Sequence, residues 1–187
     1  NGTIIGEGAG FVVLERLSSA RERGVRPLAI LSGWALGTDA HSRAAGDASG
    51  AGLARVAKTA LERAGLDACD IGYANLHGTG TVVNDLLEAA AMRELGPAAA
   101  TIPCSSTKPV TGHCLGATSA MEVILCIKAL EERVLPPSAN CQQVDPACAR
   151  LRLIEKALAA PDIRHAISLS SGFWSNHAAL IVSAWQP

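Results

Sequence analysis

Apolar positions along the chain alternate between the short continuous runs typical of buried strands and the three-to-four-residue spacing of helices. The runs predict strands over residues 11–15, 28–36, 71–76, 101–105, 165–169 and 178–184. The helical spacing predicts helices from the end of the first strand to about residue 23, and over residues 53–64, 84–95 and 116–133. Strands that alternate with helices indicate a layered α/β domain, and the last two strands predict a terminal antiparallel hairpin.

The helix predicted over residues 116–133 is apolar on most of its sides, as a buried central helix is. Glu122 is isolated among its apolar residues, and a buried carboxylate requires a partner. Residues 37–50 and 136–150 lack such periodicity and predict loops. Neither a linker nor an internal repeat interrupts the chain, so residues 1–187 form a single predicted domain.

Composition excludes several classes of function. A formal net charge of -1 and only 3% aromatic residues disfavour nucleic acid as a partner. The chain has no run of about 18 apolar residues, so no membrane span is expected, and its first residues do not resemble a signal peptide. We therefore expect a cytoplasmic protein. Its six cysteines form no CxxC pair, which predicts reduced thiols and no metal site.

The first candidate site is the segment His77-Gly-Thr79-Gly-Thr81, directly after a predicted strand. A histidine at the end of a strand, among small residues, is well placed to face a cleft. The threonine hydroxyls could orient the imidazole. A glycine turn with an incidental histidine explains the segment equally well. Asp85 and Glu88 follow at the start of the next helix, and there we favour a capping role over direct chemistry.

The second candidate site is the segment from Lys108 to His113, which leads into the apolar helix. The positive end of the helix dipole disfavours an imidazolium at His113. A neutral imidazole there could donate a hydrogen bond to a carbonyl oxygen that gains negative charge. Lys108 is the nearest cation along the chain to Glu122, so we expect these two to pair. The alternative is an exposed Lys108 and a structural His113.

Together these segments resemble the β-ketoacyl-[acyl carrier protein] synthases of the thiolase superfamily. The resemblance extends from the Gly-Glu-Gly-Ala-Gly segment at 6–10 to the last strands. The stretch from His77 to Asp85 matches the family's first histidine motif. The stretch 106–117 matches its lysine and second-histidine motif. The resemblance implies the C-terminal half of a thiolase-like fold, with a layered mixed β-sheet, and a decarboxylative Claisen condensation.

The resemblance also implies roles for particular residues. His77 and His113 would hydrogen-bond the malonyl thioester carbonyl and stabilise the enolate, and Lys108 would support them electrostatically. Supporting positions are Glu122, Glu88, Asp85, Thr79 and Thr81. No metal or organic cofactor is implied, because the substrate arrives on the phosphopantetheine of an acyl carrier protein. The implied partners are the chain's own N-terminal half, that carrier protein, and a second subunit in a homo- or heterodimer.

Two departures from the family limit this expectation. None of the six cysteines matches the family's nucleophile, which lies in the N-terminal half, so this chain alone is expected to be inactive. The other half would normally cover the apolar helix predicted over residues 116–133, so the chain alone is also expected to self-associate. Gly172 and Phe173 match the family's gating loop, whereas Trp174 and Ser175 stand where glycines are usual. We favour half of a ketosynthase. The alternatives are a non-catalytic partner subunit, like a chain-length factor, and a free-standing module that binds a carrier protein or an acyl chain.

Overall fold

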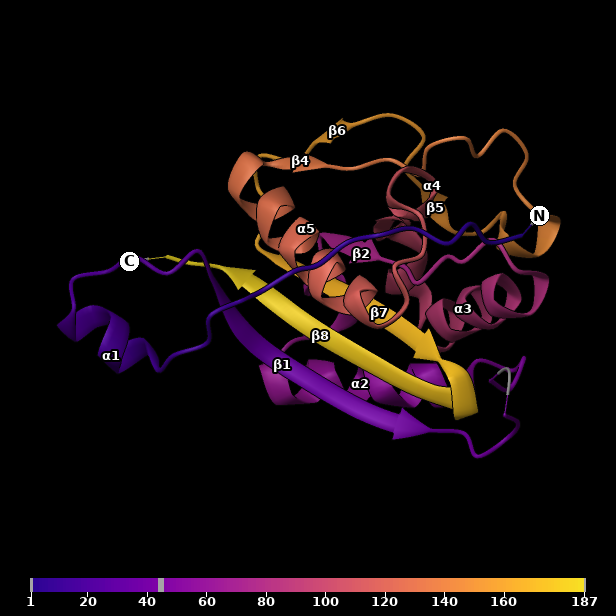
Figure 1. Ribbon diagram of the computed structural model, residues 1–187, viewed down its shortest axis with the longest axis horizontal. Coiled ribbons are helices and arrows are strands. Elements are labelled where there is room, and N and C mark those ends of the chain that lie inside the picture. Colours follow the sequence, from indigo (N-terminus) through magenta and orange to yellow (C-terminus); the bar gives the residue numbers. More distant parts are fainter. Residues whose placement is uncertain (1, 44–45, 187) are drawn as a thin grey trace.

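The computed structural model describes residues 2–43 and 46–186, which form a mixed six-stranded sheet with helices on both faces (Figure 1). The strand order is β1-β8-β7-β2-β3-β5. These strands are β1 (Ala29–Thr38), β2 (Tyr73–Asn75), β3 (Pro103–Ser105), β5 (Arg152–Leu153), β7 (His165–Gly172) and β8 (Asn176–Ala184). β8 pairs antiparallel with β1 and β7, whereas β7, β2, β3 and β5 run parallel to one another. The expected mixed sheet and terminal hairpin are therefore confirmed.

Helices α2 and α3 cover one face of the sheet, and α5 covers the other (Figure 1). The α-helices are α1 (Leu17–Glu22), α2 (Ala51–Ala64), α3 (Val82–Glu94), α4 (Lys108–Thr111) and α5 (Thr118–Glu132). Short 3₁₀ turns are η1 (Ala68–Asp70), η2 (Pro97–Thr101), η3 (Leu115–Ala117), η4 (Pro146–Cys148) and η5 (Phe173–Ser175). A small second sheet pairs β4 (Val134–Leu135) with β6 (Leu158–Ala159). Each face of the main sheet thus has its own hydrophobic core.

Helix α2 shows how the sequence sets these elements. Its buried side chains recur at helical spacing, at Leu53, Val56 and Ala60, and so form one apolar stripe. The helix ends at Gly65, whose φ of 67° is the left-handed conformation that a glycine adopts without strain. On the sheet, Gly33 allows the helix to approach, because a Cβ there would lie 2.1 Å from the Ala60 carbonyl oxygen.

The strand predicted over residues 11–15 is wrong, because the structure has no regular element there. An extended segment becomes a strand only when a neighbour pairs with its backbone, and among the described residues none does. Phe11 and Val13 are 91% and 93% exposed. The preceding glycines allow the chain to approach α5 closely, since Gly8 and Gly10 lie directly against Met121 and Ile124, and Figure 1 shows the N-terminal segment passing over this helix. The apolar character of this segment thus reflects an uncovered surface.

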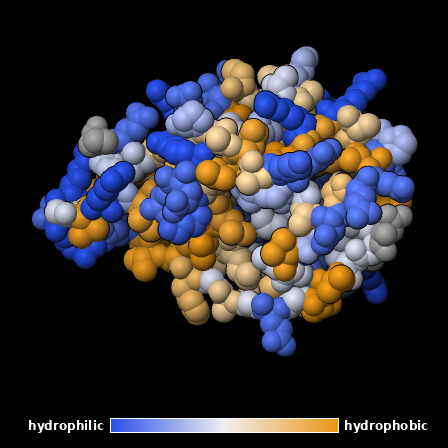
Figure 2. All heavy atoms as spheres, turned by 90° about the horizontal axis from the view of Figure 1, so that it is seen from above, coloured by the Kyte–Doolittle hydropathy of each residue, from blue (hydrophilic) through white to orange (hydrophobic). Residues whose placement is uncertain are grey.

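Apolar side chains remain at the surface elsewhere as well. Figure 2 shows them gathered in patches among polar side chains on the face seen there. On α5, Val123 and Leu130 are buried, whereas Ile124 and Leu125 are only half-buried. The central helix is therefore covered on one side by the sheet and incompletely on the other. Among the described residues, no helix is both long and apolar enough to cross a membrane.

Candidate active site

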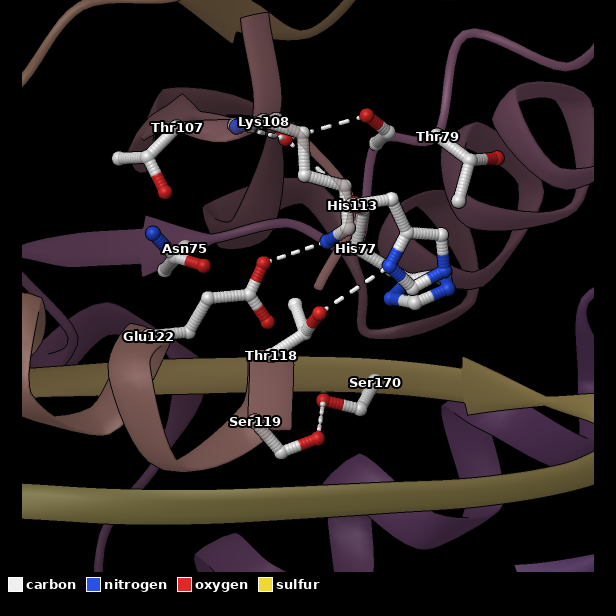
Figure 3. Close-up of polar contacts among 12 residues, drawn as sticks. Asn75, His77, Thr79, Thr107, Lys108, His113, Thr118, Ser119, Glu122 and Ser170 are labelled. Carbon is white, nitrogen blue, oxygen red and sulfur yellow. Dashed lines mark hydrogen bonds and ion pairs between the residues drawn. The ribbon is translucent and has the colours of Figure 1, made fainter. Parts of the chain in front are cut away.

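The topology brings the two predicted motifs to one edge of the sheet. His77 follows β2 and Lys108 follows β3, and these strands are parallel neighbours with Ala74 opposite Cys104. The carboxyl ends of parallel strands meet at the same edge, where ligand sites commonly form. The imidazoles of His77 and His113 lie edge to face, with ring centroids 5.2 Å apart and planes at 86° (Figure 3). The structure thus joins histidines that are 36 residues apart in the sequence.

Glu88 of α3 fixes the backbone of the first motif. Its carboxylate accepts hydrogen bonds from the backbone N–H groups of His77 and Gly78, each at 2.6 Å, and from the Asn84 side chain at 3.1 Å. Burial raises the pKa of Glu88 to about 7, while those two N–H donors oppose the shift. Because its oxygens hold the backbone at His77 and Gly78, Glu88 fixes the orientation of His77.

The other predicted supporting residues also hold the loop together. Asp85 lies in the first turn of α3 and accepts the Gly80 N–H at 3.2 Å, one residue before the N-cap Thr81, so this contact holds the loop and does not cap the helix. The hydroxyls of Thr79 and Thr81 contact each other at 2.8 Å. Gly78 has a φ of 44°, and a Cβ there would lie 2.4 Å from the Ser106 side chain. These contacts close the loop tightly against the second motif.

His113 has a defined tautomer. The Leu115 N–H donates to its Nδ1 at 3.3 Å, and the Thr118 hydroxyl contacts the same nitrogen at 3.1 Å (Figure 3). Because a backbone N–H can only donate, Nδ1 is an acceptor and the ring proton of the neutral imidazole lies on Nε2. In His77, Nδ1 is buried and has no partner in the described part of the chain. A proton on its Nε2 therefore avoids a buried, unpaired donor.

Lys108 and Glu122 form the ion pair expected from the sequence (Figure 3). Their side chains are only 5% and 2% exposed, so the alternative of an exposed Lys108 is wrong. Burial raises the pKa of Glu122 to about 7, and the Lys108 ammonium opposes that shift. A buried charge of this kind requires its partner, so Lys108 and Glu122 hold each other in place beside the histidines.

The same surroundings favour neutral imidazoles. Burial, reinforced by the charges of Lys108 and His113, lowers the pKa of His77 to about 2. Burial and the Lys108 charge also hold the pKa of His113 below its ordinary value. At neutral pH the site therefore presents two uncharged rings, each of which can offer an Nε2–H donor. Two such donors side by side can share one oxygen atom that gains negative charge.

Sequence reasoning missed the polar shell around the ion pair. Among the described residues, buried oxygens without a hydrogen-bond partner include Asn75 Oδ1, Thr107 Oγ1, Glu122 Oε2 and Ser168 Oγ. Asn75 and Ser168 are opposite each other on β2 and β7. The available signal for these polar groups was a small polar residue, Asn75, near the end of an apolar strand. No group of three or more His, Cys, Asp or Glu side chains that could hold a metal ion occurs in residues 2–43 and 46–186.

The predicted gating residues lie at the turn between β7 and β8. Gly172 ends β7, while Phe173 and Trp174 are 69% and 62% exposed. Trp174 and Ser175 have φ values of 63° and 55°, a conformation that favours glycine. A side chain in this conformation costs about 1–2 kcal/mol per residue, so surrounding contacts must hold the turn. Asn176 and His177 follow this turn and begin β8.

The six cysteines form no disulfide, as expected. Burial raises the pKa of the Cys104 thiol to about 12 and also raises the pKa values of Cys126 and Cys148. Such thiols are poor nucleophiles. Cys114 follows His113, and its sulfur lies 3.7 Å from the Thr111 carbonyl oxygen.

An open cavity of about 660 Å³ borders both motifs, and its wall includes Thr79, Glu88 and Lys108.

Residues 28–142 match the family "Beta-ketoacyl synthase, C-terminal domain". The chain belongs to this family. It is 40% identical to a polyketide β-ketoacyl synthase 1 of Streptomyces halstedii over 184 residues, which is 98% of this chain and 43% of that protein. The chain thus spans less than half the length of the curated relatives it matches.

Solved ketosynthases have the same thiolase-like fold. The ishigamide ketosynthase/chain length factor superimposes with a TM-score of 0.92 and 37% identity, over 99% of this chain and 45% of that one. A type II polyketide ketosynthase bound to its acyl carrier protein superimposes with a TM-score of 0.87 and 32% identity, over 92% of this chain and 42% of that one. The resemblance stated from the motifs is therefore confirmed at the level of family and fold.

Proposed function

We propose that this chain is the C-terminal part of a β-ketoacyl synthase that catalyses decarboxylative Claisen condensation of malonyl-[acyl carrier protein] with an acyl thioester. The observation that supports it best is the edge-to-face pair of neutral imidazoles, His77 and His113, beside a buried Lys108–Glu122 pair. Two uncharged donors side by side suit a reaction in which a carbonyl oxygen gains negative charge.

In this proposal, the Nε2–H groups of His77 and His113 donate to the thioester oxygen of the malonyl group. The bond from the malonyl α-carbon to its carboxylate breaks, carbon dioxide leaves, and the electron pair forms an enolate. The α-carbon then attacks an acyl thioester held on a cysteine of the other half of the enzyme. A carbon–carbon bond forms and the cysteine thiolate leaves. The proposal includes no metal or organic cofactor, and phosphopantetheine carries the substrate.

Lys108 acts at a distance from the reacting atoms. Its ammonium disfavours a positive charge on His77 and His113, since it lowers the pKa of both rings. The rings therefore stay neutral at the pH at which they must donate to the enolate. Glu122 compensates the ammonium, which would otherwise be a buried, unpaired charge. Glu88 keeps His77 in position through its two backbone contacts.

The proposed partners are the cysteine-bearing N-terminal half, an acyl carrier protein and a second subunit in a dimer, in the cytoplasm. The exposed Phe11 and Val13 and the half-buried side of α5 supply an apolar surface for that half. An uncovered surface of this kind promotes association. We expect the chain alone to be inactive in condensation and to self-associate in analytical ultracentrifugation. A well-behaved monomer would count against this surface as the docking site.

The test is a malonyl-[acyl carrier protein] decarboxylation assay on the chain alone and on the chain combined with its cysteine-bearing half, hereafter the reconstituted protein. Carbon dioxide release should require both halves and should be lost in His113→Ala. The surface variant Glu94→Gln serves as the control, because Glu94 is exposed at the far end of α3. Release that persists in His113→Ala would refute the proposed role of this histidine.

A non-catalytic subunit, like a chain-length factor, is the second candidate. The observation that favours it is the β7–β8 turn, where Trp174 and Ser175 occupy a glycine-like conformation at the positions where the resemblance has glycines. Such a subunit would shape a pocket for its partner's product. The two candidates differ in the other half of the protein. A cysteine there and release of carbon dioxide would support the enzyme, whereas the absence of both would support the partner subunit.

A further inference from the structure

Residues 2–6 belong to no helix or strand, yet they lie across both histidine motifs, and we call this segment the strap. At the first motif, the Gly2 N–H donates to the Gly80 carbonyl at 2.8 Å. The Thr3 hydroxyl donates to the Thr79 carbonyl at 2.6 Å. The second contact joins residues 76 positions apart, so the strap ties the loop after His77 to a distant part of the chain.

At the second motif, the strap holds both backbone groups of one histidine. The His113 N–H donates to the Ile4 carbonyl at 2.7 Å, and the Gly6 N–H donates to the His113 carbonyl at 3.1 Å. Together these two bonds make an isolated parallel β-bridge. The strap therefore supports the backbone of His113, much as the Glu88 carboxylate supports the backbone N–H of His77.

The strap approaches both motifs too closely for side chains at the points of contact. A Cβ at Gly6 would lie 2.2 Å from the Thr111 carbonyl oxygen, and a Cβ at Gly112 would lie 2.6 Å from the Gly6 Cα. At the other end, a Cβ at Gly80 would lie 2.8 Å from the Gly2 carbonyl oxygen. Backbone thus packs directly on backbone at each end, so a displacement of the strap must move the motif beneath it.

The other contacts of the second motif do not replace the strap. The Leu115 N–H and the Thr118 hydroxyl orient the ring of His113, but both belong to the same stretch of chain and move with it. The Ser106 hydroxyl joins the two motifs through the Gly78 carbonyl at 3.1 Å. That contact lies before α4, whereas His113 follows α4. The strap ties His113 itself to the first motif.

We propose that the strap positions His113 against His77, and that Thr3 and Gly6 are the positioning residues at its two ends. This inference rests on the proposed function. Neither residue touches the substrate. The ring centroids are 5.2 Å apart, and this separation decides whether both Nε2–H groups reach one oxygen atom. That oxygen carries most charge in the transition state, so a displaced strap lowers kcat and leaves KM nearly unchanged.

Thr3→Val and Thr3→Ser test the first end of the strap. Valine keeps the shape of threonine without its hydroxyl, whereas serine keeps the hydroxyl. Thr3→Val should lower kcat for carbon dioxide release by the reconstituted protein roughly threefold, and Thr3→Ser should resemble the wild type. The control is Thr101→Val, which removes another exposed hydroxyl that donates to a backbone carbonyl, that of Ala98 at 2.8 Å. Equal kcat in Thr3→Val and Thr3→Ser would refute the role of Thr3.

Gly6→Ala tests the second end, because the added Cβ forces the strap away from Thr111. It should lower kcat roughly tenfold, since small displacements of catalytic groups have effects of this size. The matched control is Gly33→Ala, whose Cβ would lie 2.1 Å from the Ala60 carbonyl oxygen, between β1 and α2. A merely structural effect lowers the folded fraction in both variants. Rates are therefore expressed per folded molecule, with the folded fraction measured by circular dichroism.

A measurement without substrate follows the two rings directly. The nuclear Overhauser effect between ring hydrogens of His77 and His113 falls steeply with their distance. In this chain it should weaken in Gly6→Ala and Thr3→Val and stay unchanged in Thr3→Ser and Gly33→Ala. An unchanged effect in Gly6→Ala, or an equal fall in kcat per folded molecule in either control, would overturn the proposal. If the wild type releases no carbon dioxide, the proposed function fails, while the Overhauser effect still decides whether the strap positions His113.

Discussion

Separating the buried Lys108–Glu122 pair should affect stability differently depending on which partner is removed. In Lys108→Met, the remaining carboxyl group can stay protonated, and the pKa of Glu122 is already about 7 in the intact pair. Because pH 8 lies about one pH unit above that pKa, keeping the carboxyl group protonated at pH 8 costs about 1.4 kcal/mol. In Glu122→Gln, a buried ammonium remains without a counter-ion. Deprotonating a lysine of ordinary pKa, about 10.4, at pH 8 limits that cost to about 3 kcal/mol.

The two variants should also show opposite dependence on pH. A carboxyl group whose folded pKa is raised binds more protons in the folded state, so stability falls as pH rises. The additional loss in Lys108→Met therefore appears as pH rises above about 7, the pKa of Glu122 in the intact pair. A buried, unpaired ammonium loses its proton more readily when folded, so stability rises with pH. The loss in Glu122→Gln should therefore shrink between pH 7 and pH 9.

Urea unfolding of both single variants and of Lys108→Met/Glu122→Gln at pH 6, 7, 8 and 9 measures these costs. The double variant should lose less than the sum of the single variants, because it leaves no unpaired charge. Lys128→Met is the control, since Lys128 belongs to an exposed pair with Glu131. Equal losses with parallel pH dependence, or additive losses, would refute the conclusion that the two buried groups depend on each other.

Other predictions concern the loop that begins at His77 and the N-terminal segment. Glu88→Gln places an amide donor against the N–H groups of His77 and Gly78, so it should cost about 1–3 kcal/mol in thermal unfolding at pH 8, whereas exposed Glu94→Gln should cost almost nothing. Gly6→Ala puts a Cβ 2.2 Å from the Thr111 carbonyl oxygen, so limited proteolysis should cleave residues 2–14 faster than in the wild type. Gly116→Ala meets no atom within 4 Å and should not change the cleavage rate.

The sequence predicts most of the fold because the relevant signals are local. The apolar stripe of α2, its terminal Gly65 and the apolar surface of α5 each indicate an element within a few residues. The Lys108–Glu122 pair was predictable because an isolated carboxylate on an apolar helix requires a cation. The strand expected over residues 11–15 was wrong for the converse reason. Strand formation depends on a partner, and the described residues provide none for that segment.

The contacts of Asp39 and His177 could not be predicted in this way. They lie 138 positions apart, and neither residue stands in a motif that indicates the other. The positive φ values of Trp174 and Ser175 were equally hidden, because no local signal marks a side chain that surrounding contacts hold in a strained conformation. Hydrogen bonds from the loop after β1 supply those contacts, and they depend on the folded arrangement of β1, β7 and β8.

The proposed chemistry depends most directly on two neutral imidazoles at pH 7, and nitrogen-15 NMR of the histidines in this chain measures that property. The chain has five histidines, so single His→Gln variants at positions 41, 165 and 177 assign the signals of His77 and His113. We predict that both rings stay neutral from pH 8 down to below the ordinary histidine pKa of about 6.5, with the proton of His113 on Nε2. A ring that becomes charged at or above pH 6.5, or a proton on Nδ1 of His113, would contradict the proposed stabilisation of the enolate.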